Sequence, residues 1–315
     1  NLEAGEKKNW QYVMSANQGE EDFYKEGLKW RHPKVEYTPL NIIGEVARIS
    51  VETPEGISMV SADAFYKVQD ERKKTVVEIC QDKENKEQYQ LIFKPSAMGE
   101  HKIVLRFDND TEDFVVLNVM DKIETVIEER VEYICDKLYH DETINPPFAF
   151  EPISNQGESL GKANLVLQKN LLGKLDVSQV QKVEKCAVNY VRPKWFIDGD
   201  FRKPRKLYGD FYRCMDFEYI AHLFYLLSEF EDETLVLNTA DTYLEWATEI
   251  FELRVNPELH QEERGKEESQ MLGVYFLYFE RLLDKLKKKG RMEQYNKIKA
   301  IWESVMDKID EEAKT

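Results

Sequence analysis

The chain has 315 residues, of which 42% are hydrophobic and 33% charged, and its formal net charge at pH 7 is −16. This length predicts more than one domain, each with an ordinary hydrophobic core. The negative charge argues against binding to nucleic acid or to an anionic membrane surface, because both need clustered Lys and Arg side chains. We see no apolar run long enough for a membrane-spanning helix.

The N-terminal part of the chain predicts a polar segment followed by short strands. Residues 1–31 are mixed and polar, so we expect an arm or linker there. In the stretch that follows, Ile103, Leu105 and Phe107 alternate with other residues, a period of two that is typical of a half-buried strand. Several such stretches separated by turn sequences predict a small immunoglobulin-like β-sandwich over residues 32–120.

The hydrophobic period then changes to three and four residues, which predicts an α-helical domain over residues 121–315. A long stretch without a clear period, 141–173, interrupts it. We expect helices at 123–139, 178–191, 213–230, 234–253, 266–289 and 291–310. The fold class is therefore multidomain, all-β followed by all-α. The helical domain is either part of an (α/α) toroid or a helical bundle.

A loop rich in acids and aromatic rings, 195–213, leads into the most apolar of these helices. Aromatic rings cover the C–H face of a sugar and carboxylates bind its hydroxyls, so this composition suggests a saccharide-binding groove. The candidate catalytic residues are Asp210, Asp216 and Glu218, because glycoside hydrolysis uses a pair of carboxyl groups. The candidate substrate-binding residues are Trp195, Asp198, Asp200, Tyr208, Tyr212, Arg213 and His222.

Each of these residues also has a purely structural interpretation. Asp210 precedes a helix, where an N-cap is expected. The Asp-Gly-Asp sequence at 198–200 is typical of a turn, and rings beside an apolar helix are often core residues. A carboxylate at Glu218 needs a partner inside a buried helix, and His222 or Arg213 could supply one.

A second loop, 145–158, combines prolines with amides and acids, among them Asn155, Gln156 and Glu158. A loop of this kind on a helical scaffold can line a ligand groove. A plain connector has the same composition, so both interpretations stay open.

No motif predicts a cofactor or a metal site. The five histidines form no HxH or HxxxH pair, and the acidic stretch 108–113 lacks the spacing of an EF-hand. There is no nucleotide-binding glycine motif and no GxSxG sequence. We expect no cofactor and no metal. The four cysteines, at 80, 135, 186 and 214, form no CxxC pair, so we expect free thiols.

The order of these parts, together with the string GDFYRCMDFEYIAHLFYLLSEF at 209–230, resembles a family of large secreted bacterial proteins known as a domain of unknown function. Its members are similar in layout to carbohydrate-active enzymes with a β-sandwich and an (α/α)6 toroid. The resemblance covers residues 32–260. It implies a secreted or cell-surface protein and places Trp195, Asp210 and Asp216 near a sugar groove. A full toroid has more helices than we expect here, so the resemblance also implies further domains of the same polypeptide.

Three functions are compatible with these features. The first is a carbohydrate-active protein of glycoside hydrolase type that acts on a polysaccharide or oligosaccharide. A polysaccharide lyase, which ranks behind it, would need a Tyr or His base and an Arg or Asn to neutralise a uronate; Tyr208, His222 and Arg213 are the candidates. The second function is a non-catalytic glycan-binding or scaffold module. The third is a structural or partner-binding helical domain.

Overall fold

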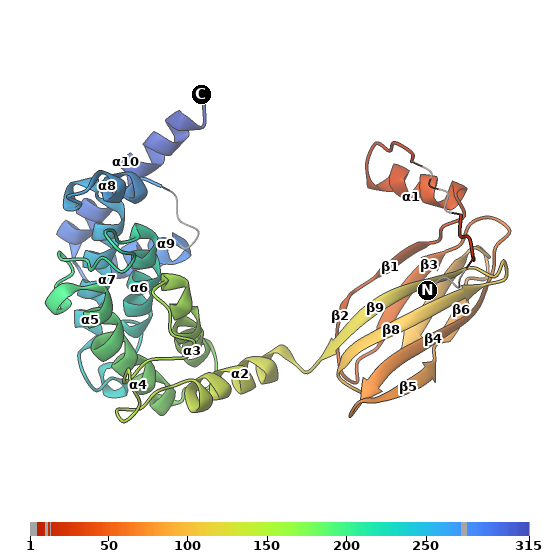
Figure 1. Ribbon diagram of the computed structural model, residues 1–315, viewed down its shortest axis with the longest axis horizontal. Coiled ribbons are helices and arrows are strands. Elements are labelled where there is room, and N and C mark those ends of the chain that lie inside the picture. The colour runs from red at the N-terminus through yellow and green to blue at the C-terminus, as the bar shows by residue number, and fades with distance from the viewer. Residues whose placement is uncertain (1–4, 10–11, 13, 272–275, 315) are drawn as a thin grey trace. The chain divides into compact units, whose positions relative to one another are not determined.

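The computed structural model describes residues 5–9, 12, 14–271 and 276–314. The chain divides into two compact units, Asn1–Val126 and Ile127–Thr315. The described strands belong to the first unit, and most of the described helices belong to the second (Figure 1). The predicted fold class, a β-domain followed by a helical domain, is confirmed.

The strands form two sheets. The first sheet has the order β1-β3-β7-β6 and the second has the order β2-β9-β8-β4-β5; all pairs are antiparallel except β2–β9. The bounds are β1 Lys34–Tyr37, β2 Leu40–Ile42, β3 Ala47–Glu52, β4 Met59–Val68, β5 Glu71–Val76, β6 Glu78–Gln81, β7 Gln88–Phe93, β8 Gly99–Phe107 and β9 Glu112–Met120.

One hydrophobic core lies between these sheets, as expected of a sandwich. Ile49 and Leu91 from the first sheet belong to the same buried cluster as Ile103 and Leu105 from the second. The alternation seen in the sequence explains this, because successive side chains of a strand point to opposite faces of the sheet. The other face of β8 carries Lys102, which is exposed.

The N-terminal arm holds a helix that the sequence did not predict, α1 (Glu20–Lys29). Its hydrophobic residues are too few to bury a face, and none of its residues is buried. Three acids in the first turn and Lys29 in the last turn complement the helix dipole, which favours a helix at this position.

The helical unit is a succession of paired helices. Contacting neighbours include α3 with α4, α6 with α7, and α9 with α10. A π-helical turn, Ala187–Val191, joins α4 to α5. The bounds are α2 Ile123–Lys137, α3 Gly161–Leu172, α4 Val177–Cys186, α5 Arg192–Trp195, α6 Cys214–Leu227, α7 Ala240–Val255, α8 Glu263–Ser269, α9 Phe279–Lys288 and α10 Met292–Glu312.

Three predicted elements need correction. Much of the stretch 141–173 is not irregular, because Gly161–Leu172 forms α3 with Ala163, Val166 and Leu167 buried. The helix expected from residue 234 begins at Ala240, where the Thr239 side chain accepts a hydrogen bond from the Thr242 N–H. The helix expected over 266–289 is divided into α8 and α9; residues 272–275 lie outside the described residues.

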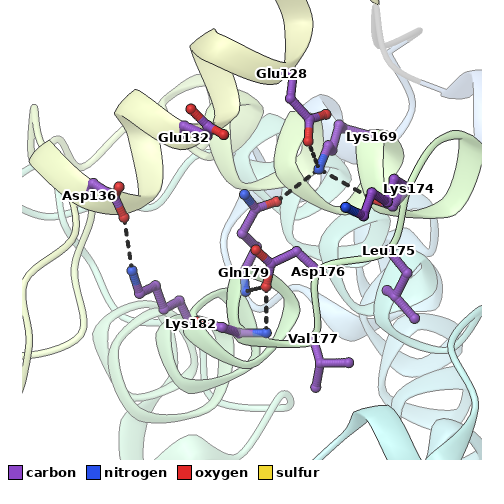
Figure 2. A pocket seen from close by; sticks show the side chains of 11 residues that line it. Glu128, Glu132, Asp136, Lys169, Lys174, Leu175, Asp176, Val177, Gln179 and Lys182 are labelled. Carbon is purple, nitrogen blue, oxygen red and sulfur yellow. Dashed lines mark hydrogen bonds and ion pairs between the residues drawn. The ribbon is translucent and has the colours of Figure 1, made fainter.

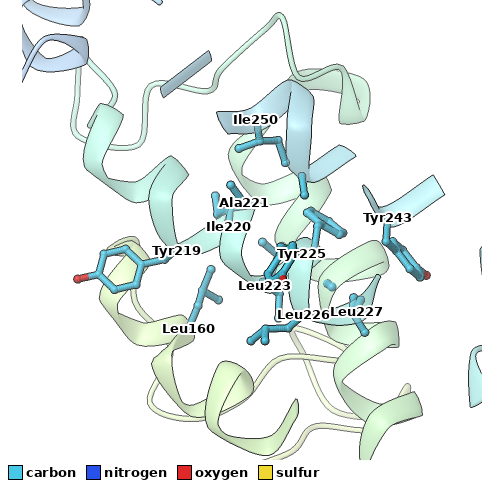
Figure 3. Close-up of a cluster of buried hydrophobic side chains, with 14 of the residues drawn as sticks. Leu160, Tyr219, Ile220, Ala221, Leu223, Tyr225, Leu226, Leu227, Tyr243 and Ile250 are labelled. Atoms are coloured by element: carbon cyan, nitrogen blue, oxygen red, sulfur yellow. The ribbon is translucent and has the colours of Figure 1, made fainter. Parts of the chain in front are cut away.

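Helix α6 lies at the centre of the helical unit. All of its residues except Met215 are buried. It contacts α3, α7 and α8, so it has neighbours on several sides, as the apolar residues on most of its surface predict. Figure 3 shows Leu160, Tyr243 and Ile250 around the apolar side chains of this helix.

The four cysteines are free thiols with different surroundings. Cys80 on β6 is exposed, whereas Cys135, Cys186 and Cys214 are buried. Burial raises the thiol pKa of Cys135 to about 11 and that of Cys186 and Cys214 to about 12. The buried thiols therefore stay protonated at neutral pH.

Candidate functional site

Two loops that the sequence singled out separately meet at the start of α6. The Tyr208 hydroxyl donates to the carbonyl oxygen of Asn155 at 2.9 Å, and the Asn155 side-chain amide donates to the carbonyl of Leu207 at 3.1 Å. Arg213 donates to Glu158 Oε1 at 2.8 Å. We call this group the α6 entrance: Asn155, Glu158, Tyr208, Arg213 and Asp216.

Asp216, in the first turn of α6, joins the parts of the α6 entrance. Its Oδ1 accepts the N–H of Gly157 at 2.9 Å, and its Oδ2 lies 3.0 Å from the Tyr208 hydroxyl. Arg213 Nη1 is 3.7 Å from Oδ1. The residue is 1% exposed, and this burial raises the pKa of its carboxyl group, although Gly157 and Arg213 act in the opposite direction.

The neighbouring groups keep distinct charge states. Burial and the negative charge of Asp216 raise the pKa of Tyr208 to about 12. Burial alone would raise the pKa of Glu158, but the hydrogen bond from Arg213 outweighs it, so this pKa is lowered. Burial would lower the pKa of Arg213, but Glu158 and Asp216 raise it overall. At neutral pH the α6 entrance therefore presents the neutral phenol of Tyr208, the carboxylate of Glu158 and the guanidinium of Arg213.

Three of these side chains reach the surface. Glu158 is 43% exposed and Arg213 is 20% exposed, while Tyr208 is half-buried. Tyr208 stacks on Phe211, with ring centroids 5.5 Å apart, and the Arg264 guanidinium lies 3.5 Å from the centroid of Phe211. The entrance thus continues as a strip of rings and cations, which is suited to stacking against a sugar that carries a negative charge.

The structure places Trp195, Glu218 and His222 in the interior. Trp195 is 2% exposed, so its ring is a core residue and not a surface platform. Glu218 pairs with Arg254 at 2.6 Å, and the side chains are 1% and 0% exposed. The sequence analysis did not consider Arg254 as a partner of Glu218.

His222 stacks on Tyr278, with centroids 4.7 Å apart. Burial lowers its pKa to about 4, so the imidazole stays neutral at pH 7.

The remaining predicted residues lie in turns or at the surface. Asp198 has a φ of 54° inside the 3-10 turn Ile197–Gly199, and Asp200 accepts the N–H of Arg202 at 2.9 Å. Asp210 is exposed, and the N-cap of α6 is Arg213, so the interpretation of Asp210 as that cap was wrong.

The Tyr212 hydroxyl lies 2.9 Å from His260 Nδ1. This contact joins Tyr212 to a buried histidine, and its ring also packs beside the buried ring of Phe217. Sequence reasoning also missed Arg254, whose only signal is a lone cation within the apolar end of α7.

Several cavities lie elsewhere. One of about 640 Å³ is lined by the acidic side of α2 and by the turn between α3 and α4 (Figure 2). Two ion pairs lie in its lining: Lys169 pairs with Glu128 at 2.9 Å, and Lys182 pairs with Asp136 at 3.4 Å. Asp176 accepts backbone N–H groups at the start of α4. These contacts give the cavity wall a structural role, and none of the predicted site residues lines it.

Among the described residues, no group of three or more His, Cys, Asp or Glu side chains is placed to hold a metal ion. In the same part of the chain, no helix has the length and apolar character needed to cross a membrane.

Comparison with known proteins gives a likeness of fold. No family model and no curated protein matches the sequence. A solved structure of a polysaccharide lyase superposes with a TM-score of 0.70 at 16% identity, over 92% of this chain and 42% of the lyase. The chain therefore shares the fold of that portion of the lyase, and it spans less than half of the lyase's length.

Two further solved structures match small parts of the chain. The Lin-41 filamin domain covers 29% of this chain and 93% of its own length, at 14% identity and a TM-score of 0.23. A superoxide reductase (neelaredoxin) from Ignicoccus hospitalis covers 28% of this chain and 80% of its own, at 10% identity and a TM-score of 0.22. Neither superposes well enough to inform function.

Proposed function

We propose that this chain is part of a carbohydrate-active protein that binds and processes an acidic polysaccharide at the α6 entrance. The single observation behind the proposal is the pairing of a partly exposed Arg213 with the half-buried ring of Tyr208, the guanidinium lying 5.6 Å from the ring centroid. The likeness of fold to a polysaccharide lyase supports the same class of ligand.

Arg213 is suited to a uronate. Its planar guanidinium can donate two parallel hydrogen bonds to a carboxylate. In the structure this guanidinium already forms an ion pair with the carboxylate of Glu158. Because Glu158 is 43% exposed, a sugar carboxylate can take its place without unfolding the loop. The ring of Tyr208 would then lie beside the bound sugar.

A β-elimination fits these groups. Arg213 neutralises the sugar carboxylate and so acidifies the adjacent C–H group. Tyr208 takes that proton while its own phenol proton passes to Asp216, 3.0 Å away, whose raised pKa suits it to accept one. The C–O bond to the leaving sugar breaks, a C=C bond forms, and the leaving oxygen takes a proton from water. The hydroxide that remains takes back the proton held by Asp216 through Tyr208, which restores the starting state.

This geometry favours a lyase over the glycoside hydrolase preferred from the sequence. Hydrolysis needs two carboxyl groups facing the substrate. Asp216 is 1% exposed, and Glu218 is held in the interior by Arg254. Among the acids of the α6 entrance, Glu158 alone reaches the surface.

Non-catalytic binding is the second candidate. The pKa of Tyr208, about 12, favours a phenol that binds and does not abstract protons. We also keep as proposals that the protein is secreted or displayed on the cell surface and that further domains of the same polypeptide complete its activity. Sequencing the complete gene tests both proposals. A signal sequence would support secretion or surface display, and additional coded domains would support the second proposal.

The experiment is a screen of the protein against alginate, polygalacturonate, hyaluronan and chondroitin sulfate. Ultraviolet absorbance detects the new C=C bond, and retention in polysaccharide-containing gels detects binding. Arg213→Ala should abolish the absorbance signal and weaken retention, whereas Tyr208→Phe should lose absorbance and keep retention. Glu158→Gln should strengthen retention, because it frees Arg213.

Arg130→Ala is the matched control. Arg130 lies 5.8 Å from the ring centroid of Tyr133, a similar pair on α2, so this change should leave both signals intact. If no acidic polysaccharide is retained or cleaved, the proposed function is wrong. If Arg213→Ala behaves like the wild type, the α6 entrance is the wrong site.

A further inference from the structure

One face of the second sheet carries exposed aromatic rings and cations that are not part of the hydrophobic core of the sandwich. Phe65 on β4 is 36% exposed, and Phe114 on β9 is 54% exposed. The outward-facing positions of these strands and of β8 share one face, because the inward positions, such as Ala64, Ile103 and Val115, are buried. We call the face formed by Phe65, Lys67, Arg72, Lys74, Lys102, Arg106 and Phe114 the outer sheet face.

The register brings the two rings to either side of one lysine. Phe65 is paired directly with Lys102 on the neighbouring strand. Lys102 Nζ lies 3.9 Å from the ring centroid of Phe114 on the next strand. With strands spaced about 4.8 Å apart and the two positions offset by two residues along β8, Phe65 and Phe114 lie roughly 12 Å apart, far enough to contact different sugar units of one polymer.

The face carries five cations against three acids, Asp63, Glu100 and Glu112, so it has a cationic excess in a chain whose net charge is −16. Lys74 and Arg106 both pair with Asp63, and Arg106 also pairs with Glu112. Among the described residues, no carboxylate lies within ion-pair distance of the other three cations. Those are Lys67, Arg72 and Lys102. Their charges are therefore available to an anionic ligand.

The surface here is also concave. A cavity of about 620 Å³ is lined by Phe65, Lys67, Arg72, Lys102 and Arg106, among others. Protection of a sheet edge would explain the lysines on β5 but not an exposed phenylalanine on β4, which is paired on both sides at Phe65. Rings that stack on sugars, combined with cations that pair with acidic groups, explain both.

We propose that the outer sheet face is a second, non-catalytic binding site for an acidic polysaccharide. The proposal rests on the function proposed above only for the class of ligand. Phe65 and Phe114 stack on sugar rings, while Lys102 and its neighbours pair with carboxylate or sulfate groups. The site holds the polymer while a different segment of it is processed.

The test uses the full chain in the Arg213→Ala background, so that the α6 entrance does not contribute. Retention is measured in gels that contain polygalacturonate, chondroitin sulfate or the neutral polymer dextran. Adding Phe114→Ala should weaken retention by the acidic polymers about threefold to tenfold, the value of one aromatic contact. Lys102→Gln should do the same and should make retention less sensitive to salt.

Lys34→Gln is the matched control, because Lys34 lies 4.8 Å from the ring centroid of Tyr24, away from the outer sheet face. The inference is overturned if Phe114→Ala and Lys102→Gln are retained like their parent, or if dextran is retained as strongly as the acidic polymers. Turnover of a short acidic oligosaccharide by otherwise wild-type Phe114→Ala should be unchanged. This measurement distinguishes failure of the second binding site on the outer sheet face from failure of the function proposed for the α6 entrance.

Discussion

At the scale of single residues, the pair Glu218–Arg254 shows how the helical unit accommodates charge in its interior. Arg254 is fully buried, and its remaining donors reach the carbonyl oxygens of Glu268, Ser269 and Met271. A buried pair is costly to break, because removing one partner leaves an uncompensated charge. These contacts fix the end of α8 and Met271 to the centre of the unit.

We therefore expect Arg254→Met to lower the free energy of unfolding by about 3–5 kcal/mol. Chemical denaturation measures the change. The control is Lys299→Gln, which removes an exposed pair with Glu303 and should cost less than about 1 kcal/mol. Equal losses in the two variants would show that Arg254 is not a structural anchor.

His222 makes stability depend on pH. Its folded pKa is about 4 and its ordinary value is 6.5, so below pH 6.5 the unfolded chain binds the proton first. The free energy of unfolding should fall between pH 6.5 and 4, and this contribution should be constant below pH 4. His222→Gln should reduce that slope, and His32→Gln, at an exposed position, should leave it unchanged. A slope that persists in full in His222→Gln would contradict the assignment.

At the scale of elements, the α6 entrance depends on close packing between the 3-10 turn Gly157–Leu160 and α6. A Cβ atom at Gly157 would lie 2.7 Å from Asp216 Cα and 2.9 Å from the Asp216 carbonyl oxygen. Both are backbone atoms of a buried helix, so the turn would have to move.

Gly157→Ala should therefore destabilise the protein by about 1–3 kcal/mol. It should also shift the near-ultraviolet signal of Tyr208, because that ring is anchored to the same loop. Gly161→Ala, four residues later with open space around it, should be neutral or stabilising by up to about 1 kcal/mol. The idea fails if both variants have the same stability.

Sequence periodicity identified the helices and strands in which the buried positions are occupied mainly by apolar residues in a regular pattern. The alternation at Ile103, Leu105 and Phe107 predicted β8, and apolar residues on nearly every side of the helix predicted a buried α6. It missed α3, because Asn164, Lys169 and Asn170 are polar yet buried and blur the apolar stripe. Lys169 lies there because Glu128 and Gln179 satisfy its charge.

The site was less predictable than the fold. The sequence pattern identified Tyr208, Arg213 and Asp216 as candidates. It did not predict that Asn155 and Glu158 contact them, because these contacts join residues more than fifty positions apart. It also named Trp195 as a substrate-binding candidate and Glu218 as a catalytic candidate, and both side chains are buried. Nothing local distinguishes a ring or an acid that faces a groove from one that packs in a core.

At the scale of the whole molecule, the chain has two separate hydrophobic cores. Leu91 lies in the sandwich core and Leu223 lies in the helical core; both are fully buried. Because each unit buries its own apolar side chains, we expect two calorimetric unfolding transitions.

Leu91→Ala should lower the free energy of unfolding of one unit by about 2–5 kcal/mol, and Leu223→Ala should do the same for the other. Differential scanning calorimetry assigns each transition to its unit by these variants. A single transition shifted by both changes would mean that the units unfold as one.

Because Cys80 is exposed and the other three cysteines are buried, Cys80 can be labelled selectively in the folded protein. A maleimide dye should attach to the native chain at β6 alone, giving a one-fluorophore sample without removing any native cysteine. The other three should become labelled only as the helical unit opens, so dye stoichiometry reports the opening of that unit over time.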